Sequence, residues 1–154
     1  MHKCIYTGIL SIMKKSSRLE FCNCFAVRQA ARQLTRLYER HLSGAQLTSA
    51  QFSILVVLED AGEITMSELA KEMVMDRTTL LRALKPLQEE ALVVSQRSTE
   101  DPRRLNFSLS AGGVRRLKKG FALWSNAQQE FEAAVGSGEA ARMRRELLAL
   151  AKST

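Results

Sequence analysis

Two short segments concentrate side chains that can bind phosphates and the edges of bases. The first is Asp76-Arg77-Thr78-Thr79, followed by Arg82 and Lys85, and the second is Asp101-Pro102-Arg103-Arg104. Arginine can donate to the acceptors of guanine, while threonine offers a hydroxyl or a methyl group. Threonine hydroxyls suit backbone phosphates equally well, and the same residue types also serve as ordinary helix caps. The two segments favour a surface that binds nucleic acid, with capping and solvated residues as the alternative.

Three cysteines supply the other reactive side chains. Cys4, Cys22 and Cys24 all fall within the first 24 residues. An odd number placed in this way does not form the disulfide framework of a secreted domain, so we expect a protein of the reducing cytoplasm. A partly exposed thiol in an electropositive setting can react with oxidants. A free cysteine on an apolar helix face is more often a small buried hydrophobe, which is the alternative for Cys24.

The sequence offers little for catalysis or metal binding. Neither His2 nor His41 has a cysteine or carboxylate at the spacing of a metal site or a catalytic triad. The sequence also contains no glycine-rich phosphate loop. We expect no metal, no cofactor and no enzymatic activity, and the one catalytic alternative is a thiol peroxidase built on Cys22 or Cys24.

The composition indicates a polyanionic partner. The chain has 154 residues, with 23 Lys+Arg against 16 Asp+Glu and a formal net charge of +7. This imbalance favours nucleic acid ahead of an acidic membrane surface. Hydrophobic residues at 45% and charged residues at 25% are close to the average of soluble globular domains, so neither disorder nor a membrane span is expected.

Helix-start signals precede three closely spaced helices in the middle of the chain. Thr48 and Thr65 each stand three residues before a glutamine or glutamate, the spacing of a capping box, and Asp76 caps the third helix. Further along, the apolar period changes to two, which predicts strands over 93–97 and 105–109. A short helix, a tight turn, a second helix that opens with arginine and threonine, and a hairpin with a basic tip form the order of a winged helix-turn-helix.

Amphipathic helices are predicted on both sides of this unit. Apolar residues at steps of three and four predict one helix over 19–42. A near-heptad apolar stripe predicts a second helix, capped by Ser110 and ending at Val135, and a short helix follows over 139–152. Narrow apolar stripes of this kind need a partner helix.

The segment from Asp101 to Gly113 resembles the wing signature of the MarR (multiple antibiotic resistance regulator) family of bacterial transcription factors. That signature is an Asp-x-Arg, an alternating strand, a Leu-Thr or Leu-Ser step and a glycine, and the resemblance covers about Leu19 to the end of the chain. It implies that Arg103 enters the minor groove, steadied by Asp101, and that Ser67 contacts the phosphate backbone. Together with the recognition helix, the candidate DNA-binding residues are Ser67, Arg77, Thr78, Thr79, Arg82, Lys85, Asp101, Arg103 and Arg104.

The resemblance also implies the organisation of the molecule. The fold would be mainly α with a small β-hairpin wing, a winged helix-turn-helix whose N- and C-terminal helices form a homodimer. The dimerisation region would cover 19–46 and 110–154, and the DNA-binding domain 47–109; ahead of the resemblance, we expect a flexible tail over 1–18. The implied function is a regulator, most simply a repressor, of palindromic operators in double-stranded DNA, released by a small aromatic ligand or by thiol oxidation. A winged-helix module that binds another protein instead of DNA is the remaining alternative.

Part of the first helix resembles the organic-hydroperoxide-sensing OhrR subgroup of that family. Cys24-Phe25-Ala26-Val27 is similar to the Cys-Phe-Ala-Leu of its reactive cysteine, and Tyr38 matches one tyrosine that holds the thiolate. Arg28 stands where the subgroup has a second tyrosine, which removes one hydroxyl partner. On one helix Cys22 would point about 200° from Cys24, so a disulfide between them would require the helix to unwind. The candidate redox residues are therefore Cys22, Cys24 and Tyr38, with a bond between subunits as an alternative.

Overall fold

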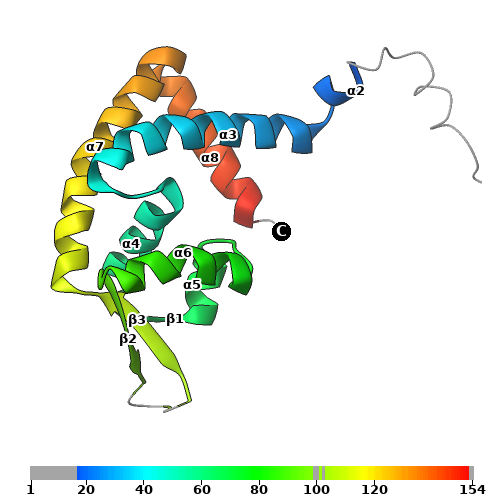
Figure 1. Cartoon of the computed structure of the whole chain (residues 1–154). Helices are drawn as coiled ribbons and strands as arrows, with labels where there is room; N and C mark the ends of the chain where they lie inside the picture. The colour runs from blue at the N-terminus through cyan, green and yellow to red at the C-terminus, as the bar shows by residue number, and fades with distance from the viewer. Residues whose placement is uncertain (1–16, 99–100, 102, 153–154) are drawn as a thin grey trace, which may run out of the picture. The chain divides into compact units, whose positions relative to one another are not determined.

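The structure is a computed structural model that describes residues 17–98, 101 and 103–152 (Figure 1). His2, Cys4 and Pro102 lie outside the described residues, as does nearly all of the tail expected over 1–18. The chain divides into two units, Met1–Leu37 and Tyr38–Thr154.

The described residues are mostly helical, with one small antiparallel sheet. This arrangement confirms the expected fold class, mainly α with a β wing. The helices are α2 (Ser17–Glu20), α3 (Asn23–Leu42), the 3-10 turn η1 (Ser43–Ala45), α4 (Ser49–Ala61), α5 (Met66–Glu72), α6 (Arg77–Glu89), α7 (Ala111–Val135) and α8 (Ser137–Lys152). The strands are β1 (Ile64–Thr65), β2 (Val93–Arg97) and β3 (Leu105–Leu109).

The sheet has the order β1-β3-β2, and both pairs of neighbours are antiparallel. The β2–β3 pair is the predicted hairpin, with Val93 opposite Leu109 and Arg97 opposite Leu105, and it projects away from the helices around it (Figure 1). The strand β1 was not predicted, because two residues are too short to show a period of two. It ties the segment that enters α5 to the wing.

Side-chain caps start the helices at the predicted residues. Thr48 and Thr65 each form a complete capping box, in which the threonine hydroxyl and the side chain three residues later accept from each other's backbone amides. Asp76 accepts from the amide of Thr79 at the start of α6, and Ser110 caps α7. These caps set where the two helices of the DNA-binding motif begin.

The first long helix begins later than the apolar pattern predicted. Instead of one helix from residue 19, α2 ends at Glu20 and α3 begins at Asn23. Cys22 lies in the break: its carbonyl accepts from the amide of Ala26 at 3.0 Å, and its Sγ accepts from the amide of Phe25 at 3.4 Å. Cys22 therefore takes the capping position of α3. The expectation that it shares a helix with Cys24, facing the opposite way, was wrong.

The break before the last helix is also shorter than expected. Gly136, with a φ of 90°, ends α7, and its carbonyl already accepts from the amide of Ala140. The last helix therefore begins at Ser137 rather than at 139.

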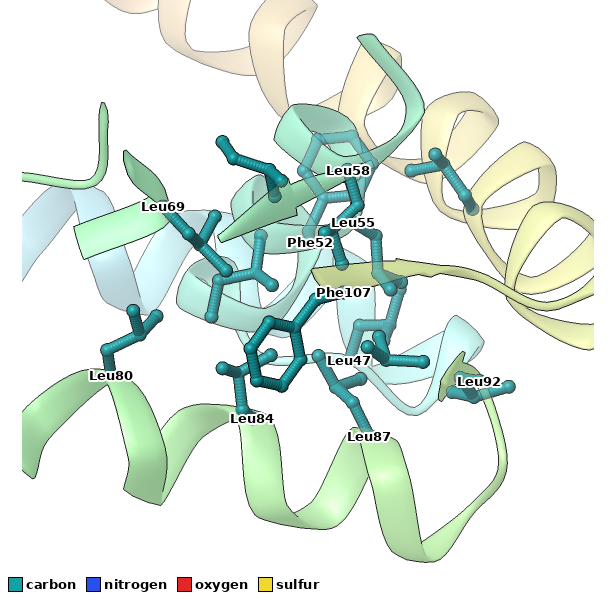
Figure 2. Packing of buried hydrophobic residues seen from close by; sticks show 14 of the residues in the cluster. Leu47, Phe52, Leu55, Leu58, Leu69, Leu80, Leu84, Leu87, Leu92 and Phe107 are labelled. Atoms are coloured by element: carbon teal, nitrogen blue, oxygen red, sulfur yellow. The ribbon is translucent and has the colours of Figure 1, made fainter. Parts of the chain in front are cut away.

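The hydrophobic core lies between α4, α5, α6 and the sheet (Figure 2). The α6 residues Leu80, Leu84 and Leu87 are buried and point toward Leu69 of α5 and Phe107 of β3 (Figure 2). The predicted apolar face of α6 is thereby confirmed. Because that face is occupied by the core, the basic residues of α6 lie on its solvent side.

The apolar stripe of α7 is only partly covered within one chain. Leu117 is buried, and Phe121 and Trp124 form an aromatic cluster with Phe52 of α4, with ring centroids 5.3–6.3 Å apart. Val135, in contrast, remains exposed. None of the helices among the described residues is long and apolar enough to cross a membrane.

Candidate nucleic-acid interface

A groove of about 630 Å³ lies between the start of α5, one side of α6 and the strands of the wing. We call it the wing groove. It brings together four of the predicted DNA-binding residues, which come from three separate parts of the sequence: Ser67, Arg77, Arg103 and Arg104. Met66, Leu81, Leu105 and Phe107 supply its apolar lining.

The start of α6 is fixed by a network around Asp76. Its Oδ1 accepts from the amide of Thr79 at 2.9 Å, and its Oδ2 accepts from the hydroxyl of Thr79 at 2.6 Å. The hydrogen bond from the Thr79 side chain, and to a lesser extent the one from its backbone, holds the pKa of the Asp76 carboxyl below its usual value. The hydroxyl hydrogen of Thr79 thus bonds to another residue of the protein, although Thr79 itself is exposed. Arg77 and Thr78 are exposed beside it.

The remaining predicted residues of α6 form a second exposed stripe next to the groove. With about 100° per residue, Thr78, Arg82 and Lys85 lie within about 60° of one another on the helix. Arg77 leads the neighbouring stripe that lines the groove. Lys85 pairs weakly with Glu89 at 3.7 Å, with both side chains exposed, so its ammonium remains available for another anion. The structure therefore keeps these three residues together but outside the wing groove.

Asp101 organises the tip of the wing. Its Oδ1 accepts from the amide of Arg103 at 3.0 Å, and its Oδ2 lies 3.5 Å from Nε of Arg104. Its backbone carbonyl also accepts from the amide of Arg104 at 2.9 Å. The carboxylate thus steadies Arg103 through the main chain and pairs with the guanidinium of Arg104. Within the described part of the chain, the guanidinium of Arg103 has no acidic partner.

Two charged residues, one in the wing groove and one on β2, were not predicted as site residues. Glu68 lines the wing groove, where its Oε2 accepts from the amide and the hydroxyl of Thr65 at 2.9 and 2.6 Å. The hydrogen bond from the Thr65 side chain is the main reason that the pKa of Glu68 is lowered, and the bond from the Thr65 backbone adds to it. A negative charge therefore faces an otherwise basic groove. The capping-box signal predicted the bonds but not the groove. Arg97 is exposed at the far end of β2, and its place at the end of an alternating strand was the signal available for it.

The cysteines lie in a surface environment. Cys22 is half-buried and Cys24 exposed, and both are free thiols. Cys24 is therefore not buried within the described part of one chain, and its interpretation as a buried hydrophobe stays a prediction that concerns the dimer. The hydroxyl of Tyr38 donates to Gln128 of α7, and burial is the main reason that its pKa is raised. Fourteen residues of helix separate Cys24 from Tyr38, about 21 Å along the axis, so a contact between them would need a second chain.

Comparisons with known proteins agree with this geometry. The profile of the MarR family matches residues 47–105, which span the helix-turn-helix and the wing up to the start of β3. The solved structure of the Mycobacterium tuberculosis transcriptional regulator MosR in complex with DNA is 38% identical, with a TM-score of 0.76, and the match covers 86% of this chain and 95% of that chain. The chain belongs to the MarR family.

Two curated regulators are similar to this MarR-family chain. It is 28% identical over 97 residues to the organic hydroperoxide resistance transcriptional regulator of Bacillus subtilis, and 27% identical over 100 residues to SarZ of Staphylococcus haemolyticus. The matches cover 63% and 65% of this chain, and 66% and 68% of those proteins, about two thirds of their length. The chain is accordingly a winged-helix transcriptional regulator and not an enzyme.

Proposed function

We propose that the protein is a homodimeric repressor that binds palindromic operators in double-stranded DNA and acts in the cytoplasm. The observation that supports this most strongly is the wing groove, where exposed arginines of α6 and of the wing line the same surface. The net charge of +7 supports a polyanionic partner.

The individual roles follow from position. Arg77 and the neighbouring stripe of α6 read base edges in the major groove, and Ser67 at the start of α5 contacts the phosphate backbone. Arg103 enters the minor groove, because its guanidinium is free of acidic partners among the described residues while its backbone is held by Asp101. Arg104, which pairs with Asp101, supports the tip of the wing and adds charge there.

Dimerisation would cover apolar side chains that are exposed in the described part of one chain. Phe21 is 76% exposed, Val27 44% and Leu148 57%. We assign these faces to contacts with a second copy, so that residues 19–46 and 110–154 form the dimerisation region and 47–109 the DNA-binding domain. A two-fold dimer presents two copies of α6, and its operator is then palindromic, with half-sites about one helical turn apart.

Substitution of one wing arginine tests the assignment. Arg103→Ala is expected to weaken operator binding by about 1–3 kcal/mol without changing the melting temperature. Arg142→Ala is the control, since Arg142 is an exposed arginine that pairs with Glu139 within α8. Fluorescence anisotropy with an operator selected from random DNA measures both affinities. Equal affinity of Arg103→Ala and the parent would contradict the wing assignment. A parent protein that shows no salt-dependent binding to DNA would favour a protein-interaction module.

Release by an oxidant is favoured by a specific observation: two free thiols, Cys22 and Cys24, lie two residues apart at the start of α3. The Cys24 thiolate attacks the O–O bond of an organic hydroperoxide, giving a sulfenic acid and an alcohol. The thiol of Cys22, or of a second subunit, then displaces water from the sulfenic acid to form a disulfide. If Cys22 reacts, α3 loses the sulfur that accepts from Phe25, and oxidation thereby reaches the start of the helix.

The variant Cys24→Ser distinguishes release of DNA by an oxidant from release by a small aromatic ligand. The parent, treated with an organic hydroperoxide, is expected to lose DNA binding and to regain it on addition of a thiol, while Cys24→Ser keeps it throughout. Hydroperoxide-induced loss in Cys24→Ser would exclude Cys24 as the sensor. Binding that is indifferent to hydroperoxide in both proteins would leave a ligand-responsive regulator.

A further inference from the structure

The first turns of α7 contact the turn that follows α6. The hydroxyl of Ser110 donates to the carbonyl of Ala91 at 2.7 Å, and its amide donates to the carbonyl of Leu92 at 3.0 Å. One turn along, a Cβ on Gly113 would lie 2.2 Å from the carbonyl oxygen of Leu92, so glycine lets the two backbones touch. These contacts come from one face of α7, because its residues are spaced by three.

Arg116 continues this face and completes the contact. Its Nη1 lies 3.1 Å from Oε2 of Glu90, the residue that follows α6, and donates to the carbonyl of Ala45 in η1 at 3.2 Å. The Arg116 side chain is only 22% exposed. It therefore joins α7, the end of α6 and η1 at one point, and its positive charge also suits the negative end of the α6 dipole.

Because α6 is long, a small change at this contact would move the residues at the other end of the helix, which face DNA in the proposed function. The helix has 13 residues and is about 20 Å long, with Arg77 at its far end. A tilt of about 5° at the Glu90 end would move the Arg77 end by about 2 Å, which is enough to break hydrogen bonds to base edges.

We infer that Arg116 is a positioning residue for DNA recognition: it fixes the angle of α6 on α7 and so the spacing of the two recognition helices in the dimer. This inference rests on the proposed function. Arginine is needed because one planar guanidinium serves both a carboxylate and a carbonyl, which the point charge of lysine does less well.

The test is the dependence of affinity on half-site spacing. An operator selected by the parent is compared with versions lengthened or shortened by one base pair between the half-sites. The parent is expected to prefer its own spacing sharply, whereas Arg116→Gln binds that operator about tenfold more weakly and discriminates little among the three. Arg116→Lys should lie between them. Arg115→Gln is the matched control, as it removes the same charge from an exposed neighbour on α7 and should keep the preference of the parent.

The outcomes are distinguishable. Arg116→Gln that melts like the parent and keeps its spacing preference overturns the inference and leaves the proposed function intact. If Arg116→Gln fails to fold, Glu90→Gln weakens the same contact from the other side and should flatten the preference, and a sharp preference in that variant overturns the inference equally. Absence of operator binding by the parent would overturn the proposed function, and the inference with it.

Discussion

At the scale of single residues, two neighbouring arginines of the wing make different contacts. Arg103 and Arg104 are adjacent in sequence, yet Asp101 pairs with the guanidinium of one and the main chain of the other. The sequence predicted which residue types gather at the interface. It could not predict that Thr79 donates its hydroxyl to Asp76, because threonine suits a cap and a phosphate equally well and only the backbone geometry decides.

The cap at Asp76 makes stability depend on pH in a defined direction. A carboxyl whose pKa is lowered in the folded state contributes stability above its unfolded pKa and loses that contribution as the pH falls through its folded value. Asp76→Asn keeps a capping side chain without the titration. We expect the difference in melting temperature between the parent and Asp76→Asn to shrink as the pH falls from 7 to 3.

Circular dichroism at several pH values measures this difference. Asp60→Asn is the control for the removal of one carboxylate charge, because Asp60 is an exposed aspartate on α4. A constant difference for Asp76→Asn across the whole pH range would contradict the role of the cap.

At the scale of elements, helix starts were predictable and helix ends were less so. Starts carry local side-chain signals such as Thr48 and Thr65. Gln46, Val74 and Ala91, which follow helix ends, take a positive φ without being glycine. In each case a paired set of backbone hydrogen bonds closes the end, as with Val74, whose amide donates to the carbonyl of Lys71. The residue that follows packs against the core, and this tertiary contact is invisible to a local pattern.

Val74 should be replaceable by glycine with a gain in stability. It is β-branched, has a φ of 49° and is 70% exposed, so its side chain adds strain and little packing. We expect Val74→Gly to raise the free energy of unfolding by about 0.5–1 kcal/mol, after the larger entropy of the unfolded glycine is subtracted. Val74→Ala is the control, because it removes the branched side chain but keeps the left-handed strain. Urea unfolding that ranks Val74→Gly below the parent would contradict this account.

The buried face of α6 should be the stability centre of the DNA-binding domain. Leu84→Ala is expected to cost about 2–5 kcal/mol of unfolding free energy, since the side chain is fully buried and the cavity is only partly refilled. Leu81→Ala, on the same helix but 43% exposed, is the matched comparison and should cost much less. Equal losses in thermal or urea unfolding would show that the face is assigned incorrectly.

At the scale of the whole molecule, the net charge of +7 and the exposed apolar faces are the observations behind the proposal of two partners, DNA and a second copy of the chain. The fold was predictable because its elements carry local signals of period, cap and turn. The wing groove was predictable only in part. The sequence predicted Arg77 and Arg103 as DNA-binding residues, but their place in one groove depends on how α6 and the hairpin pack around Phe107. Phe21 and Leu148 are exposed in the described part of one chain, and a local sequence pattern carries no information about which surface covers them.

The most direct measurement is a titration of the purified protein against an operator that it selects from random DNA, at several salt concentrations. We predict two chains bound per palindromic duplex, much weaker binding to a single half-site, and an affinity that falls steeply with salt as counterions are released. One chain per duplex would contradict the dimer. An affinity that does not depend on sequence or on salt would contradict the assignment of the wing groove as a surface that recognises DNA.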